Sequence, residues 1–212
     1  MEDIIKVNDV SLTLENNNIL KNITVSFERG KIHGLIGRNG SGKTMLMKCI
    51  CGFIKVSSGE IVVDGKRVGK DVDFPENIGI IIENPGFVPY YSGYKNLKLL
   101  ADLNKRIGKE DILRSMEKVG LDPKLKRHVK KYSLGMRQRL GLAQAIMEDP
   151  ELLILDEPFN GLDKEGVQDM RKYLLAYKAQ GKTILICSHS TEDIAVLCDT
   201  VHEMDKGIIS KA

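Results

Sequence analysis

The sequence has no tryptophan, few aromatic residues (5%) and no long hydrophobic run. Its longest apolar stretch is about five residues, far below the roughly 20 that a membrane-spanning helix needs. The first residues, "MEDIIKV", are acidic and unlike a secretion signal, so we expect a cytoplasmic protein. A strong charge of one sign is also missing. The net charge of +3 gives no ground for expecting a nucleic-acid-binding surface.

Clusters of metal-binding residues are missing too. The four cysteines include Cys49 and Cys51, but no nearby cysteine or histidine completes a zinc-binding spacing, and the four histidines are scattered. We therefore expect the cysteines to be small buried apolar side chains.

Strand-like and helix-like segments alternate along the 212 residues, which predicts an α/β fold in a single domain spanning residues 1–212. The first sixty or so residues are rich in strand patterns, and Asp64-Gly65 is typical of a hairpin turn. Residues 84–147 have mainly helical patterns, and Leu97, Leu100 and Leu103 are expected on one helix face. These residues are predicted to form a helical subdomain inserted into a strand-containing core.

One glycine-rich stretch, "GLIGRNGSGKT", matches the P-loop pattern between a predicted strand and a predicted helix. Glycines allow the backbone N–H groups to curl around a phosphate, and the helix N-terminus adds positive potential. The lysine is expected to reach the β- and γ-phosphates of ATP, and the threonine hydroxyl to bind Mg²⁺. The candidate nucleotide-binding residues are Gly37, Arg38, Asn39, Gly40, Ser41, Gly42, Lys43 and Thr44.

Two acidic residues follow the buried strand pattern "LLIL". Asp156 stands where P-loop proteins hold Mg²⁺. Glu157 follows it and is a candidate general base for an attacking water. The pair favours hydrolysis of the γ-phosphate of ATP.

Together these motifs resemble the ATP-binding subunit of an ABC transporter, and the resemblance extends over nearly the whole chain. Its further motifs are the signature "YSLGMRQRLGLAQAIM", the D-loop "NGLD" and the switch segment "CSHS". The resemblance implies a P-loop NTPase fold of ABC type, with an antiparallel β subdomain, a RecA-like core and the inserted helical subdomain. It also implies a head-to-tail dimer with a second ATPase subunit that traps two ATP molecules.

In that dimer, Ser133 and Gly135 of one subunit would complete the γ-phosphate site of the other. His189 would contact the γ-phosphate from the near side, and Asp163 would link the two sites. A monomer would then bind ATP and hydrolyse it poorly, because half of the site is missing.

The sequence departs from the family pattern at three places. Leu14 stands where an aromatic residue usually covers adenine, and "YSLGM" replaces the usual "LSGGQ". Glu83 replaces the usual glutamine of the Q-loop, where it is a candidate catalytic residue and Mg²⁺ ligand. Glutamate here, followed by "NPGF", resembles the subgroup associated with bacitracin and lantibiotic resistance. The Asn84–Tyr94 region would then face an integral-membrane permease, with Phe87, Tyr90 and Tyr91 as anchors.

We therefore expect a bacterial ATPase, peripheral on the inner face of the cell membrane, that powers export of a peptide-like antibiotic or similar compound through a separate permease. An alternative is a soluble ABC-type ATPase acting on nucleic acid or ribosomes. Such family members carry two nucleotide domains or a long coiled-coil insertion, which do not fit 212 residues. A phosphotransferase is a third possibility, but it leaves the signature segment and Glu157 without a role.

Overall fold

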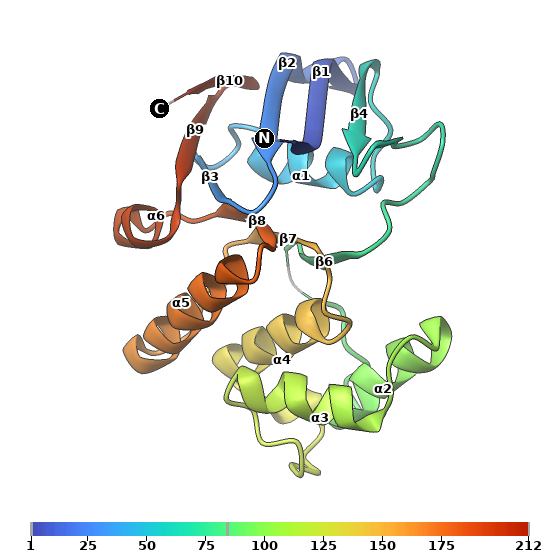
Figure 1. The fold of residues 1–212 in the computed structure, drawn as a ribbon, viewed down its shortest axis with the longest axis vertical. Helices are drawn as coiled ribbons and strands as arrows, with labels where there is room; N and C mark the ends of the chain where they lie inside the picture. The colour runs from blue at the N-terminus through green and yellow to red at the C-terminus, as the bar shows by residue number, and fades with distance from the viewer. Residues whose placement is uncertain (1, 84, 212) are drawn as a thin grey trace.

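The computed structural model describes residues 2–83 and 85–211, and these form two sheets and a group of helices (Figure 1). The first sheet is antiparallel and has the strand order β2-β1-β4-β5. Its strands are β1 (Asp3–Leu14), β2 (Asn17–Glu28), β4 (Ser58–Val63) and β5 (Lys66–Arg67). The Asp64-Gly65 turn joins β4 to β5 and confirms the predicted hairpin, with both turn residues at positive φ.

The second sheet has the strand order β10-β9-β3-β8-β7-β6. Its strands are β3 (Ile32–Ile36), β6 (Ile78–Ile81), β7 (Leu152–Asp156), β8 (Thr183–Cys187), β9 (Thr200–Asp205) and β10 (Ile208–Lys211). All neighbouring strands from β9 to β6 are parallel, and β10 returns antiparallel at the edge. The carboxyl ends of β3, β8, β7 and β6 therefore lie side by side, where open α/β sheets bind their ligands.

One helix lies between the two sheets. Helix α1 (Lys43–Ile50) begins directly after the P-loop and buries Leu46, Met47 and Ile50 in a core shared with both sheets. Cys49 and Cys51 belong to the same core, where burial raises their thiol pKa values to about 11 and about 12. These two cysteines are the small buried side chains that the sequence predicted.

The remaining helices form a second layer. Helices α2 (Gly93–Asn104), α3 (Lys109–Lys118) and α4 (Leu134–Ile146) pack together at one end of the molecule, with the short 3₁₀ turn η1 (Val129–Lys131) between α3 and α4 (Figure 1). Helices α5 (Lys164–Ala179) and α6 (Thr191–Leu197) pack against each other nearer the sheet. Within residues 2–83 and 85–211, no helix has the length and hydrophobicity that crossing a bilayer requires.

One predicted helix face is wrong in part. Leu97 is fully buried and Leu100 packs against the same core, but Leu103 is 77% exposed. A spacing of three residues falls about 60° short of a full turn, so two such steps rotate Leu103 away from the buried face.

Candidate active site

The P-loop joins the end of β3 to α1 through three glycines with positive φ. Gly37 has φ 142°, and a Cβ atom there would collide with the backbone oxygen of Met204. Gly42 is the N-cap of α1, with φ 110°. These conformations favour glycine, and they fold the loop over the N-terminus of α1, which is a ready anion-binding position.

Lys43 and Thr44 begin α1 with their side chains held in place. The Lys43 ammonium donates hydrogen bonds to the carbonyl oxygens of Gly37 (2.7 Å) and Arg38 (3.1 Å), so the charge lies within the curve of the loop. The Thr44 hydroxyl donates to Asp156 Oδ2 at 2.7 Å. A hydroxyl beside a carboxylate offers the oxygen ligands that Mg²⁺ prefers.

Glu157 follows the end of β7 in a left-handed conformation, with φ 50°. For a non-glycine residue this conformation is strained, and such strain concentrates at functional sites. Its backbone N–H donates to Cys187 O of β8, which fixes the turn. Burial raises the pKa of the Glu157 carboxyl, and the neighbouring Asp156 charge acts in the same direction. A carboxylate with a raised pKa is better suited to accept a proton from water.

His189 follows β8 and lies against Glu157. Its Nε2 is 3.1 Å from Glu157 Oε1, and its backbone N–H donates to Oε2 at 3.4 Å. The His189 side chain is half exposed. The structure thus brings together two predicted residues that are 32 positions apart.

A buried ion pair supports the His189 segment from behind. Arg171 of α5 donates through Nε to Asp193 Oδ1 of α6 at 2.8 Å, and both side chains are almost fully buried. The other carboxylate oxygen of Asp193 accepts from the Ser188 hydroxyl at 3.0 Å. Ser188 Oγ in turn accepts from the backbone N–H of Ser190, so the contacts flank His189 on both sides. No sequence motif predicts this network, because it forms only when α5 and α6 pack together.

A cavity of about 370 Å³ opens over the P-loop and the strand ends. Its lining includes the loop from Asn39 to Thr44 together with Asp156, Glu157 and His189. Ile19 of β2 also lines it, whereas Leu14, the predicted adenine contact, is 39% exposed and lies outside this lining. Sequence reasoning missed Ile19 because this third residue of β2 belongs to no recognisable motif.

The buried hydroxyl oxygen of Ser41 has no hydrogen-bond partner within the described residues. Oε1 of Glu157 is also buried, and the His189 Nε2 that lies 3.1 Å from it makes no hydrogen bond to it. Buried polar groups are nearly always satisfied, so unpaired ones facing a phosphate-type loop fit a polar ligand. The loop geometry, the Lys43 ammonium and these oxygens together fit the phosphates of a nucleotide.

Glu83 follows β6 with φ 57° and is 61% exposed. Its carboxylate is ion-paired with Lys48 in the last turn of α1, with Nζ and Oε1 2.6 Å apart. The side chain lies outside the lining of the cavity. Asn84 lies outside the described residues.

The signature and D-loop residues form a separate group in this chain. Ser133 is the N-cap of α4 and accepts a hydrogen bond from Met136 N. Gly135 packs so closely on Gly161 that a Cβ atom at Gly135 would collide with its backbone oxygen. Asp163 caps α5 by accepting from Gly166 N at 3.1 Å. None of Ser133, Gly135 and Asp163 lines the cavity over the P-loop.

Comparison with known proteins identifies this arrangement. The family model described as "ABC transporter" matches residues 20–160. The chain is 44% identical over 204 residues to the ABC transporter ATP-binding protein YybJ of Bacillus subtilis (strain 168), covering 96% of this chain and 94% of that protein. It is 37% identical to the bacitracin transport ATP-binding protein BcrA of Enterococcus faecalis, covering 98% of this chain and 68% of that protein. It is also 37% identical to the lantibiotic transport ATP-binding protein SrtF of Streptococcus pyogenes, covering 97% and 89%.

The fold agrees with these relatives. A dimeric structure of the ATP-binding cassette MJ0796 bound to ADP and Pi superposes with a TM-score of 0.87, covering 98% of both chains at 19% identity. The predicted fold class is confirmed. The chain belongs to the ABC transporter family, as an ATP-binding cassette of the kind that hydrolyses ATP to drive transport.

Proposed function

We propose that this cassette powers a separate membrane permease that exports a peptide-like antibiotic or a similar compound. The observation that carries the proposal is the similarity, over almost the whole chain, to ATP-binding proteins named for bacitracin and lantibiotic transport. The permease would select the substrate, and the cassette would supply the free energy of ATP hydrolysis.

The roles proposed for the cavity residues follow from their contacts. The P-loop from Gly37 to Thr44 holds the phosphates, and Thr44 with Asp156 holds Mg²⁺. When bound, Mg²⁺ neutralises charge on the β- and γ-phosphates. Glu157 accepts the proton of the attacking water, and His189 orients Glu157 and contacts the γ-phosphate. Glu83 can join the Mg²⁺ ligands only if its carboxylate leaves Lys48.

The apolar contact to the base is proposed to come from β1 and β2. Leu14 ends β1 and is partly exposed, as an adenine contact must be. Ile19 already lines the cavity over the P-loop, so it shares this role with Leu14 in our proposal. An aliphatic surface covers a purine without a stacking ring, which gives weak selectivity among bases.

The second ATPase subunit is proposed to complete each site from the opposite side. Ser133 begins α4 with its hydroxyl at the helix N-terminus, the end that attracts anions. Gly135 and Asp163 are adjacent to it through the close packing of Gly135 on Gly161. Because Ser133 and Gly135 lie away from their own chain's cavity, a head-to-tail partner gives them a phosphate to bind, and Asp163 is proposed to link the two sites.

The permease is proposed to dock on the segment from Pro85 to Tyr94, the described part of the Asn84–Tyr94 region. Tyr90 is 64% exposed and Val88 is 41% exposed, whereas Phe87 packs against the helical core. Tyr90 is therefore the main anchor in our proposal and Phe87 a support. Docking there would hold the cassette on the cytoplasmic face of a bacterial membrane.

The test is a resistance assay in a bacterium sensitive to bacitracin and to a lantibiotic. The cassette is expressed with the membrane protein that co-purifies with it, and the minimal inhibitory concentrations are measured. We expect them to rise with the wild-type pair and to return to baseline with Glu157→Gln. The control is Glu165→Gln, which removes an exposed acid in the first turn of α5. Resistance that persists with Glu157→Gln, or no co-purifying membrane protein, would contradict the proposal.

A further inference from the structure

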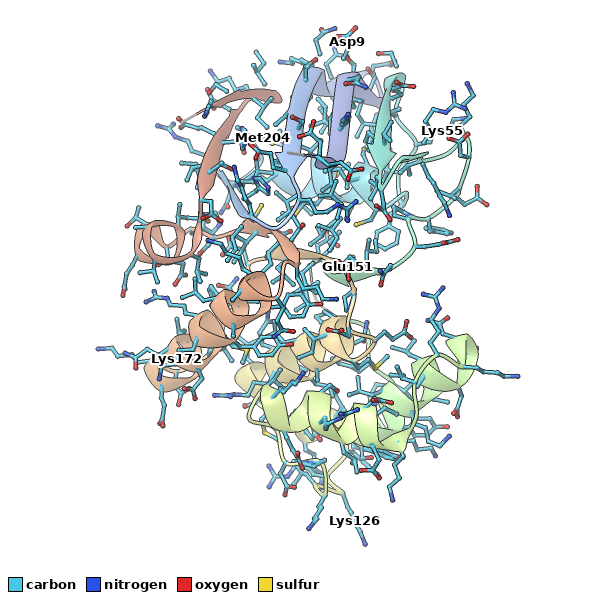
Figure 2. The ribbon with its side chains drawn as sticks, viewed as in Figure 1. Asp9, Lys55, Lys126, Glu151, Lys172 and Met204 are labelled. Atoms are coloured by element: carbon cyan, nitrogen blue, oxygen red, sulfur yellow. The ribbon has the colours of Figure 1, made fainter. Side chains whose placement is uncertain are left out.

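A dense group of cations precedes the signature segment and has no part in the site above. The segment "PKLKRHVKK" runs from Pro123 to Lys131 and contains five basic residues and no acid. We call these five residues the basic loop: Lys124, Lys126, Arg127, Lys130 and Lys131. Figure 2 shows Lys126 at the end of the molecule furthest from the strands.

All five side chains of the basic loop are exposed. Many lysines and arginines elsewhere form ion pairs, such as Lys48 with Glu83 and Lys182 with Glu151. In the part of the chain that the structure describes, no basic-loop residue has an acidic partner within 4.0 Å. Their charges are therefore available to an external anion.

The backbone beneath these charges is fixed. Val129 is 3% exposed, and its N–H donates to Tyr91 O at 2.9 Å. Lys130 N donates to Pro89 O at 2.9 Å, and the buried Tyr132 hydroxyl accepts from Gly93 N at 3.2 Å. These hydrogen bonds join the loop to the segment proposed to face the permease. The exposed cations are therefore carried by a backbone that is fixed in place.

Charge is distributed unevenly over the molecule. Residues 84–147 contain 14 basic and five acidic residues, a formal net charge of +9 within a chain of +3. The remaining residues contain 18 basic and 24 acidic residues, a net charge of −6. Such a dipolar distribution would orient the molecule near a negatively charged plane, with the helical end toward it.

An exposed aromatic residue adjoins the cations. The Lys130 ammonium lies 4.2 Å from the centroid of the Tyr90 ring, and Tyr90 is 64% exposed. Tyrosine is enriched where proteins meet the headgroup region of a bilayer, because its ring is apolar and its hydroxyl is polar.

From these observations we propose that the basic loop binds the anionic phospholipid headgroups of the membrane, next to the permease that Tyr90 is proposed to contact. Clusters of four to eight lysines and arginines close to a bilayer are typical of binding to acidic lipids. An exposed cluster of cations at the end of the molecule (Figure 2) fits a plane of charge better than it fits a nucleic-acid strand, which favours a groove. The inference adds a lipid contact to the proposed membrane association, and its vesicle-binding test needs no permease.

The experiment measures co-sedimentation of the purified chain with vesicles. One set contains phosphatidylcholine alone, and the other contains phosphatidylcholine with 30% phosphatidylglycerol. We expect binding only to the anionic vesicles, with affinity falling as salt rises. Changing all five basic-loop residues to glutamine should weaken binding by about 100-fold or more, since each cation near the surface contributes roughly fivefold.

The matched control removes the same net charge from the other end of the molecule. It changes five exposed lysines outside residues 84–147 to glutamine: Lys21, Lys55, Lys70, Lys206 and Lys211. We expect this variant to bind anionic vesicles within about threefold of wild type, because the interaction is local over a Debye length of about 8 Å. Equal losses in the two variants would overturn the proposal, since net charge alone would then explain binding.

Two further outcomes would also overturn it. A 30-nucleotide RNA is tested as a second probe, and basic-loop-dependent binding to RNA that is tighter than to anionic vesicles would make the surface a nucleic-acid site. Wild-type vesicle binding by the basic-loop variant, with loss of the co-purifying permease, would make it a protein-docking site. ATP hydrolysis by the basic-loop variant is expected to stay at the wild-type level, which excludes misfolding.

Discussion

Replacing Glu157 by glutamine should lower the rate of ATP hydrolysis and raise the stability of the fold. The side chain is 20% exposed, its Oε1 is buried without a hydrogen bond, and burial raises its pKa. The change keeps the shape of the side chain and removes only its charge and its basicity. Because a general base contributes about 10²- to 10⁴-fold to a rate, we expect ATP hydrolysis to fall by at least 100-fold.

The same change should make the protein more stable at neutral pH. The folded state holds the Glu157 proton more tightly than the unfolded state does, so the stabilising contribution present at low pH is lost as pH rises through the folded pKa. Glutamine stays neutral and avoids that loss. One buried polar atom remains unpaired in the variant, so we expect only about 1 kcal/mol of added stability.

Urea unfolding at pH 7 and at about pH 4, compared between wild type and variant, measures this effect. The stability difference should shrink at the lower pH, where both side chains are neutral. Glu165→Gln is the control for losing an exposed negative charge. Hydrolysis within tenfold of wild type would refute the general-base role, and a variant less stable than wild type at pH 7 would refute the desolvation argument.

Three other perturbations test separate parts of the site. Burial raises the pKa of Glu157, so this base is protonated at a higher pH than an ordinary glutamate is. In a pH-rate profile, the acid-side loss of kcat for ATP hydrolysis should therefore begin at a higher pH. Glu83→Gln should leave ATP affinity unchanged but alter the Mg²⁺ concentration for half-maximal hydrolysis; an unchanged titration removes Glu83 from the metal site. Arg171→Met should lower the free energy of unfolding in urea by about 3 kcal/mol, because it leaves the buried Asp193 carboxylate without its charged partner. The exposed Arg114→Met should change stability little, and equal effects of the two would count against the buried network.

Local motifs made much of the site predictable. Short sequence patterns identify the P-loop and the two acids at the end of β7. The strand-end rule then brings Thr44 to Asp156 across 112 positions. His189 meets Glu157 for the same reason, since β7 and β8 are parallel neighbours. The strand order of the sheet thus places three separate motifs around one cavity.

Other contacts depend on helix and strand packing that no short pattern encodes. The Lys48–Glu83 ion pair joins the end of α1 to the loop after β6, and the Arg171–Asp193 pair joins α5 to α6. Ile19 enters the cavity because β2 pairs with β1 above the P-loop. These residues follow from tertiary structure, so they could not be identified from spacing alone.

We propose that two copies of this cassette share each ATP, with Glu157 supplied by one copy and Ser133 by the other. The most direct test is the solution mass of Glu157→Gln with saturating Mg-ATP, alone and combined with Ser133→Arg. We expect twice the mass of one chain for the single variant and the mass of one chain for the double variant, with ATP bound to both. A dimer that forms regardless of Ser133, or a single variant that stays monomeric with ATP bound, would contradict the shared site.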